Sequence, residues 1–259
     1  PLSNVSIGRD GFVFMNSHRI DRPNFVYHLL CEQQANPTDT LLQEMDQIFT
    51  SVSGYYRERG YPVTITAAPT NVAIYPDKLP LTLDKKYRDL CQAYDNNDAL
   101  LYQLQRRGQQ TGRYTVYYPL DLFKQHRDEP YFWPKELFHW SGRSAFLFAR
   151  DLLVQSGIVD TLKLDDPVEV GLVGDDLVMF FGFSRKVKAY KYPYANFQTT
   201  VKEPEWITSL SKQKGMLHFT TANGLSRKKG LLISNSFGIE LAPHLAKGFS
   251  DFYFFNLNH

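Results

Sequence analysis

The chain has only two cysteines, no long hydrophobic run and almost no net charge. Cys31 and Cys91 lie far apart in the sequence, and neither has a second cysteine close by. This spacing gives no support for a zinc site or a thioredoxin-like redox motif. The two thiols either pair in an oxidising compartment or stay as buried free thiols, and the sequence leaves both alternatives open.

The sequence lacks features that several classes of function require. The longest mostly apolar segments, 177–183 and 252–257, are far shorter than the roughly 20 residues that span a bilayer. The 29 basic residues are nearly cancelled by 27 acidic ones, so a nucleic-acid partner is not expected. No glycine-rich nucleotide-binding motif occurs, and the seven histidines lack metal-ligand spacing. We therefore expect no metal and no cofactor.

The composition is that of a folded protein. Hydrophobic residues make up 43% of the chain and charged residues 22%, which excludes a disordered chain. The 259 residues are enough for one large domain or two small ones. We expect a single domain over residues 1–259.

Helical and strand-like patterns alternate along the chain. Apolar residues at helical spacing predict helices over 38–59, 87–107, 144–155 and 239–247. Short apolar runs predict strands at 63–68, 114–119, 230–233 and 252–256. This alternation favours an α/β fold with a mainly parallel sheet flanked by helices, whose site lies at the carboxyl ends of strands. Residues 160–223 contain short β-like runs and predict a β-rich excursion.

Ser236 is a candidate nucleophile. It lies in a small polar turn between the apolar strand 230–233 and a helix. A serine on such a bend exposes its hydroxyl close to helical N–H groups that can stabilise an oxyanion. The alternative is that the serines of this turn serve only as capping residues.

His139 is the candidate general base. It lies between a segment rich in aromatic residues and proline and the predicted helix 144–155, so it can reach the edge of the sheet. A histidine can accept the serine proton, and a carboxylate such as Glu136 can orient its ring. The alternative is that His139 and Trp140 form a packing pair while Glu136 is solvated.

Five segments in order resemble one family, the SGNH-hydrolase-like proteins of bacterial exopolysaccharide O-acetylation, typified by the alginate O-acetylation proteins. The segments read GRDGFVF, APTNVAIYPDKLP, FHWS, GDDL and ISNSFG, at residues 8–14, 68–80, 138–141, 174–177 and 233–238. The resemblance implies an SGNH-hydrolase-like fold. It also implies that Ser236 attacks an acetyl donor, that His139 acts as base and then acid, and that a sugar hydroxyl takes the acetyl group.

The resemblance also carries expectations about binding, partners and location. We take Asn71, Asn235, Trp140 and Tyr75 as candidates for stabilising the oxyanion or binding substrate. The expected partners are a polysaccharide acceptor and an acetyl donor or donor protein, within a membrane-associated biosynthetic complex. The expected location is the periplasm or another extracytoplasmic space, with an anchoring segment outside the residues given.

The sequence departs from the family pattern at three positions. Ser234 replaces the glycine of the serine segment, Asn71 replaces the lysine of the proline-containing loop, and the third departure concerns the carboxylate. The family has an aspartate two residues before the histidine, and this chain has Leu137 there. Three interpretations follow: Glu136 replaces the carboxylate, a Ser–His dyad works without it, or the site is inactive. In the last case the protein is a polysaccharide-binding or scaffold component. A plain carbohydrate acetylesterase is a further alternative.

Overall fold

A computed structural model describes residues 5–16, 25–83, 85–92, 98–140, 142–159, 169–174, 186–191, 199–202, 216–222 and 224–257. The chain divides into two compact units. Unit 1 comprises residues 1–128 and 175–185, and unit 2 comprises residues 129–174 and 186–259. The single domain expected over the whole chain stays a prediction.

Unit 1 is mostly helical. Its α-helices are α1 (Phe25–Tyr27), α2 (Asp39–Arg57), α3 (Asn71–Ile74), α4 (Lys85–Gln92), α5 (Leu100–Thr111) and α6 (Leu120–His126). Shorter helical turns are η1 (Arg9–Gly11), η2 (His28–Gln33) and η3 (Pro76–Lys78). Its strands are β1 (Val5–Ile7), β2 (Val13–Met15), β3 (Thr64–Thr66) and β4 (Thr115–Tyr117). β1 pairs with β2 antiparallel, and β3 pairs with β4 in parallel.

The predicted helix 38–59 is present as α2. Thr38 is its N-cap, because the Thr38 hydroxyl accepts a hydrogen bond of 3.2 Å from the Leu41 N–H. Leu42 and Phe49 are buried in a core that also holds side chains of α5 and β4. Two members of the predicted apolar stripe, Ile48 and Val52, are instead exposed.

The single helix predicted over residues 87–107 was wrong, since α4 and α5 are separate helices. The apolar spacing continues through this range, but it also contains the polar sequence Asp95-Asn96-Asn97-Asp98. Asn and Asp favour turns because their side chains hydrogen-bond to nearby backbone groups. A short helix, α3, follows β3, and its first turn is capped by Thr70.

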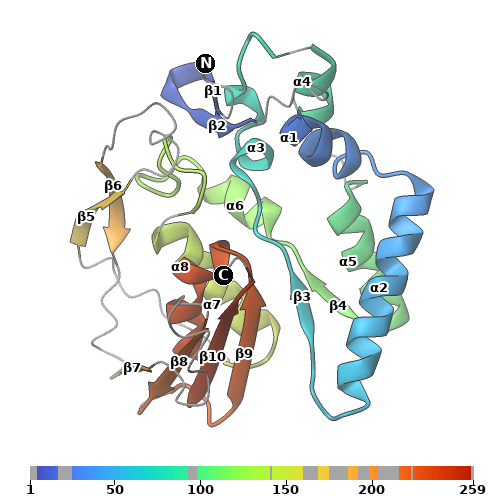
Figure 1. Ribbon diagram of the computed structural model, residues 1–259, viewed down its shortest axis with the longest axis vertical. Coiled ribbons are helices and arrows are strands. Elements are labelled where there is room, and N and C mark those ends of the chain that lie inside the picture. The colour runs from blue at the N-terminus through green and yellow to red at the C-terminus, as the bar shows by residue number, and fades with distance from the viewer. Residues whose placement is uncertain are drawn as a thin grey trace. The chain divides into compact units, whose positions relative to one another are not determined.

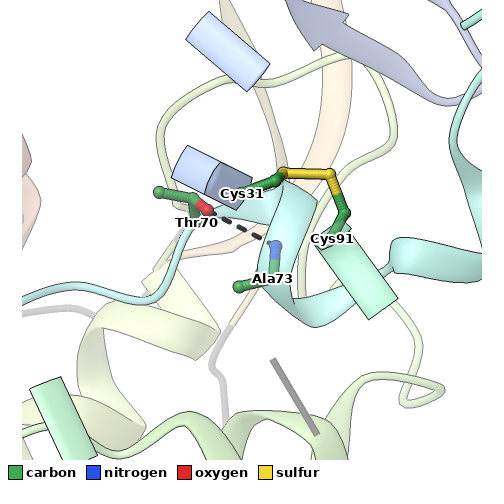
Figure 2. The surroundings of a disulfide bond; sticks show 4 residues. All are labelled: Cys31, Thr70, Ala73 and Cys91. Atoms are coloured by element: carbon green, nitrogen blue, oxygen red, sulfur yellow. Dashed lines mark hydrogen bonds between the residues drawn. A yellow bond between two sulfur atoms is a disulfide. The ribbon is translucent and has the colours of Figure 1, made fainter. Parts of the chain in front are cut away.

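Cys31 of η2 and Cys91 of α4 form a disulfide, which settles the alternative that the sequence left open. Figure 2 shows the disulfide beside the start of α3, where the Thr70 hydroxyl accepts a hydrogen bond from the Ala73 N–H. Both cysteines are fully buried. The bond therefore ties two helical segments that are 60 residues apart within unit 1.

The described residues of unit 2 form two helices and two small sheets. The helices are α7 (Gly142–Gln155) and α8 (Phe237–Ala246). The strands are β5 (Glu169–Gly174), β6 (Lys186–Lys191), β7 (Thr199–Lys202), β8 (Met216–Thr221), β9 (Lys229–Ser234) and β10 (Asp251–Asn256). β7, β8, β10 and β9 form one sheet in that order, and α8 packs on it and on α7 (Figure 1).

The α/β character of the chain is as predicted, but its sheets are small. Among the strands that the structure describes, only β3–β4 and β9–β10 pair in parallel, and the other pairs are antiparallel. An extended, mainly parallel sheet is therefore not seen in this part of the chain. The β-rich excursion at 160–223 contains β5, β6, β7 and β8. All its other residues except 222, including 175–177 of the GDDL segment, lie outside the described residues.

No helix in the described ranges combines the length and the apolar character needed to cross a membrane.

Candidate active site

A serine and a histidine far apart in sequence meet within unit 2. The Ser236 hydroxyl lies 2.7 Å from Nε2 of His139, although the two residues are 97 positions apart. Both side chains are partly buried. This distance lies within the range for a serine hydroxyl bonded to the ring nitrogen that takes its proton.

The turn between β9 and α8 holds Ser236 in place. Ser236 is the N-cap residue of α8, with φ −55° and ψ −25°. The preceding Asn235 accepts two hydrogen bonds, one at Oδ1 from the Phe237 N–H (3.1 Å) and one at its carbonyl from the Gly238 N–H (2.9 Å). The Asn235 side chain therefore fixes the first turn of α8 through its Oδ1.

Aromatic side chains hold His139. The rings of Phe138 and Phe237 lie 5.1 Å and 4.8 Å from the imidazole, centroid to centroid. The buried Trp140 donates from Nε1 to the Phe237 carbonyl (2.9 Å) and so ties the histidine segment to the start of α8. The sequence proposed substrate binding for Trp140. The structure shows that Trp140 positions the histidine segment through this hydrogen bond. Its role in substrate binding stays a prediction.

Gly238 lets α8 approach the sheet closely. A Cβ atom at this position would lie 2.5 Å from the Phe254 ring and 2.7 Å from the Ser234 Cβ. Such distances are too short for real contacts, so any side chain here would push α8 away from β9 and β10. The position of Ser236 at the start of α8 therefore depends on a glycine two residues later.

Gly238→Ala is expected to lower the free energy of unfolding by about 1–3 kcal/mol, because overpacking costs more than the helix propensity of alanine returns. Urea unfolding followed by circular dichroism measures the change. Gly54→Ala is the matched control, since Gly54 also lies in a helix but has open space around it. That control is expected to raise stability by up to about 1 kcal/mol. Equal effects of the two substitutions would contradict the close approach of α8 to the sheet.

The residue at the family's aspartate position does not supply a carboxylate. Leu137 is buried, and its carbonyl accepts a hydrogen bond of 3.0 Å from Nε1 of Trp133. The catalytic role of Glu136 stays a prediction.

The sequence reasoning missed Glu240, an acidic residue in the first turn of α8. Its carboxylate interacts electrostatically with His139. The signal that could have found it is its spacing of four residues from Ser236, because residues four apart share a helix face.

Asn71 and Tyr75 belong to unit 1, where their described contacts are internal. Asn71 is buried and donates from Nδ2 to the Val13 carbonyl (3.2 Å). The Tyr75 hydroxyl donates to the Arg127 carbonyl (2.9 Å), and burial raises the Tyr75 pKa. Their proposed roles at the oxyanion or the substrate remain predictions.

Over the described ranges, no group of three or more His, Cys, Asp or Glu side chains is arranged to hold a metal ion.

Comparison with known proteins gives a likeness in fold without a likeness in sequence. No family model matches the chain, and no curated protein is similar to it in sequence. Bacillus cereus PatB1, solved with a sulfonyl adduct, superposes with a TM-score of 0.52 at 14% identity, over 84% of this chain and 80% of that one. Pseudomonas aeruginosa AlgX superposes with a TM-score of 0.51 at 10% identity, over 98% of this chain and 53% of AlgX.

A third similar structure is the O-acetyltransferase domain of Pseudomonas putida AlgJ, with a TM-score of 0.47 at 12% identity. It is matched over 95% of this chain and 78% of that domain. At these identities the PatB1 and AlgX superpositions establish a shared fold only.

Proposed function

We propose that this protein is an O-acetyltransferase that moves an acetyl group onto a hydroxyl of a secreted bacterial polysaccharide through Ser236 and His139. The observation that supports it most directly is the 2.7 Å contact between the Ser236 hydroxyl and the His139 imidazole. The order of the family-like segments along the chain supports the acetyl chemistry. The finer fold assignment, an SGNH-hydrolase-like domain, belongs to the same proposal.

In the first half of the reaction the acetyl group moves onto the protein. The Ser236 Oγ attacks the acetyl carbonyl while its proton passes to Nε2 of His139. The resulting oxyanion is stabilised by the helix dipole at the N-terminal end of α8 and by Asn235 Nδ2 as a side-chain donor, since the Phe237 and Gly238 N–H groups already donate to Asn235. His139 then gives the proton to the leaving group of the donor, and the acetyl-enzyme remains.

In the second half a sugar hydroxyl takes the place of the donor. His139 accepts the proton of that hydroxyl, whose oxygen attacks the acetyl carbon. The bond from the acetyl carbon to Oγ breaks, and the proton on His139 returns to Ser236. The acetyl group ends as an ester on the sugar, and the protein is regenerated.

The proposed extracytoplasmic location is supported by the Cys31–Cys91 disulfide, because such bonds form and persist mainly in oxidising compartments. The acetyl donor, or a protein that delivers it, would act in the same compartment, as part of a membrane-associated biosynthetic complex.

The direct test is to separate transfer from hydrolysis. The protein is incubated with p-nitrophenyl acetate, with and without polysaccharide fragments, and the acetyl group is followed by mass spectrometry onto protein, sugar and water. We expect an acetyl-enzyme on Ser236 and acetylated sugar. Acetate alone, unaffected by sugar, would identify an acetylesterase.

A second function, a polysaccharide-binding or scaffold component, is favoured by one observation, the leucine at the family's aspartate position. Glycan binding that survives Ser236→Ala, together with no acetyl-enzyme, would support it. Because Bacillus cereus PatB1 was solved with a sulfonyl adduct, a sulfonyl fluoride is a suitable independent probe of the nucleophile here.

A further inference from the structure

The first turn of α8 carries a carboxylate next to the Ser–His pair. Glu240 lies four residues after Ser236, and Ser236 already has helical φ and ψ angles. Residues four apart on a helix have Cβ atoms about 5–6 Å from each other on one face. Since the Ser236 hydroxyl contacts Nε2 of His139, Glu240 lies on the side of α8 that His139 approaches.

An electrostatic interaction links Glu240 to His139. Burial raises the pKa of the Glu240 carboxyl, and the opposing influence, which lowers it, comes from His139. The residue as a whole still reaches solvent, so its carboxyl can exchange a proton with water. Among the residues that the structure describes, His139 is the one titratable group identified as acting on Glu240.

The histidine of α8, His244, does not act as a charged partner of Glu240. His244 lies one turn beyond Glu240 and is buried. Burial, with the nearby Lys247 as a smaller cause, lowers the pKa of His244 to about 3. His244 is therefore uncharged at neutral pH and adds no charge beside Glu240.

Resting on the proposed function, we propose that Glu240 is the positioning residue for His139: its carboxylate stabilises the positive charge that His139 gains when it takes the Ser236 proton. Glu240 itself takes no proton in this step. The proton moves from Ser236 Oγ to His139 Nε2, and the carboxylate lowers the energy of the resulting imidazolium through its charge. It supplies from α8 what the side chain at Leu137 cannot.

The test measures how fast Ser236 reacts in the whole protein, without needing the natural donor. Phenylmethylsulfonyl fluoride sulfonylates a serine hydroxyl: the Oγ–S bond forms, fluoride leaves, and the hydroxyl proton passes to the base. Intact-mass spectrometry gives the labelling rate across a pH series for wild type, Glu240→Gln and Glu240→Asp. Glu44→Gln, an exposed glutamate on α2, is the matched control.

We expect Glu240→Gln to lower the plateau labelling rate about tenfold, which is the order of effect of removing one partly exposed charge near the imidazole. We also expect the acid limb of the rate profile to move to lower pH, since loss of the carboxylate disfavours the protonated imidazole. Glu240→Asp keeps the charge and should keep the limb close to that of wild type. Glu44→Gln should match wild type throughout.

Two results would overturn the inference while leaving the proposed function in place. One is a Glu240→Gln profile identical to that of wild type. The other is a labelling rate that falls equally at every pH while the acid limb stays at its wild-type pH. A purely structural role would produce that result. A wild-type protein in which Ser236 is not labelled would instead overturn the proposed function, and this inference with it.

Discussion

Ser236→Ala is expected to lower the rate of acetyl transfer by at least about 10³-fold, because alanine cannot form the acetyl-enzyme. His139→Ala should cost a similar factor, since the two residues act as one unit and their effects do not add. Steady-state release of p-nitrophenol from p-nitrophenyl acetate measures the rate. Intact-mass spectrometry of the same samples shows whether an acetyl-enzyme accumulates.

Ser234→Ala is the matched control for this prediction. Ser234 ends β9 only two residues before Ser236, and alanine keeps the Cβ that lies close to Gly238. The control should therefore keep the local fold and most of the rate. Acetyl transfer that is equally fast in the Ser236→Ala protein would remove the acyl-enzyme mechanism.

Reduction of the Cys31–Cys91 disulfide is expected to lower the free energy of unfolding of unit 1 by about 4 kcal/mol. The bond closes a loop between residues 60 positions apart, and opening it returns conformational entropy to the unfolded chain. Urea unfolding with and without dithiothreitol measures the difference. Fluorescence and circular dichroism should be recorded together, because two units need not unfold in one step.

The control for the disulfide is the double variant Cys31→Ala/Cys91→Ala. It should resemble reduced wild type in stability, and dithiothreitol should not change it further. Alanine is used because both positions are fully buried, where a serine hydroxyl would add its own cost. Oxidised and reduced wild type with the same unfolding midpoint would contradict a stabilising role for the bond.

The two predictions report on different parts of the chain. Ser236 and His139 lie in unit 2, whereas the disulfide lies in unit 1. A double cysteine variant that still labels at Ser236 would show that unit 2 keeps its site when unit 1 is weakened. That measurement needs no further reagent beyond the sulfonyl fluoride.

Local signals predicted the helices well where one face alone is buried. The α2 helix follows from its apolar spacing, and it begins after Thr38, whose hydroxyl caps its first turn. The same spacing misled at residues 87–107, because periodicity continues through a segment whose Asn and Asp side chains favour a turn. The apolar spacing of α2 also did not predict that Ile48 and Val52 are exposed, because exposure depends on which helix or strand packs nearby.

The candidate site was predictable in part. The turn around Ser236 has a local signature, and the resemblance of ordered segments pointed to His139. Glu240 was not predicted as a site residue, because an acidic residue in the first turn of a helix is ordinarily explained by its favourable interaction with the helix dipole. Its relation to His139 became visible only when the imidazole was placed beside Ser236.

The sequence by itself determined the α/β class, the polar turn that presents Ser236 and the absence of a carboxylate at Leu137. These features depend on neighbours within a few residues, where side-chain type and spacing dictate the backbone. Only the tertiary structure decided that Cys31 bonds Cys91 and that His139 meets Ser236. Such contacts join residues 60 or more positions apart, and tertiary packing selects them: η2 packs against α4 in unit 1, and α8 packs on the sheet in unit 2.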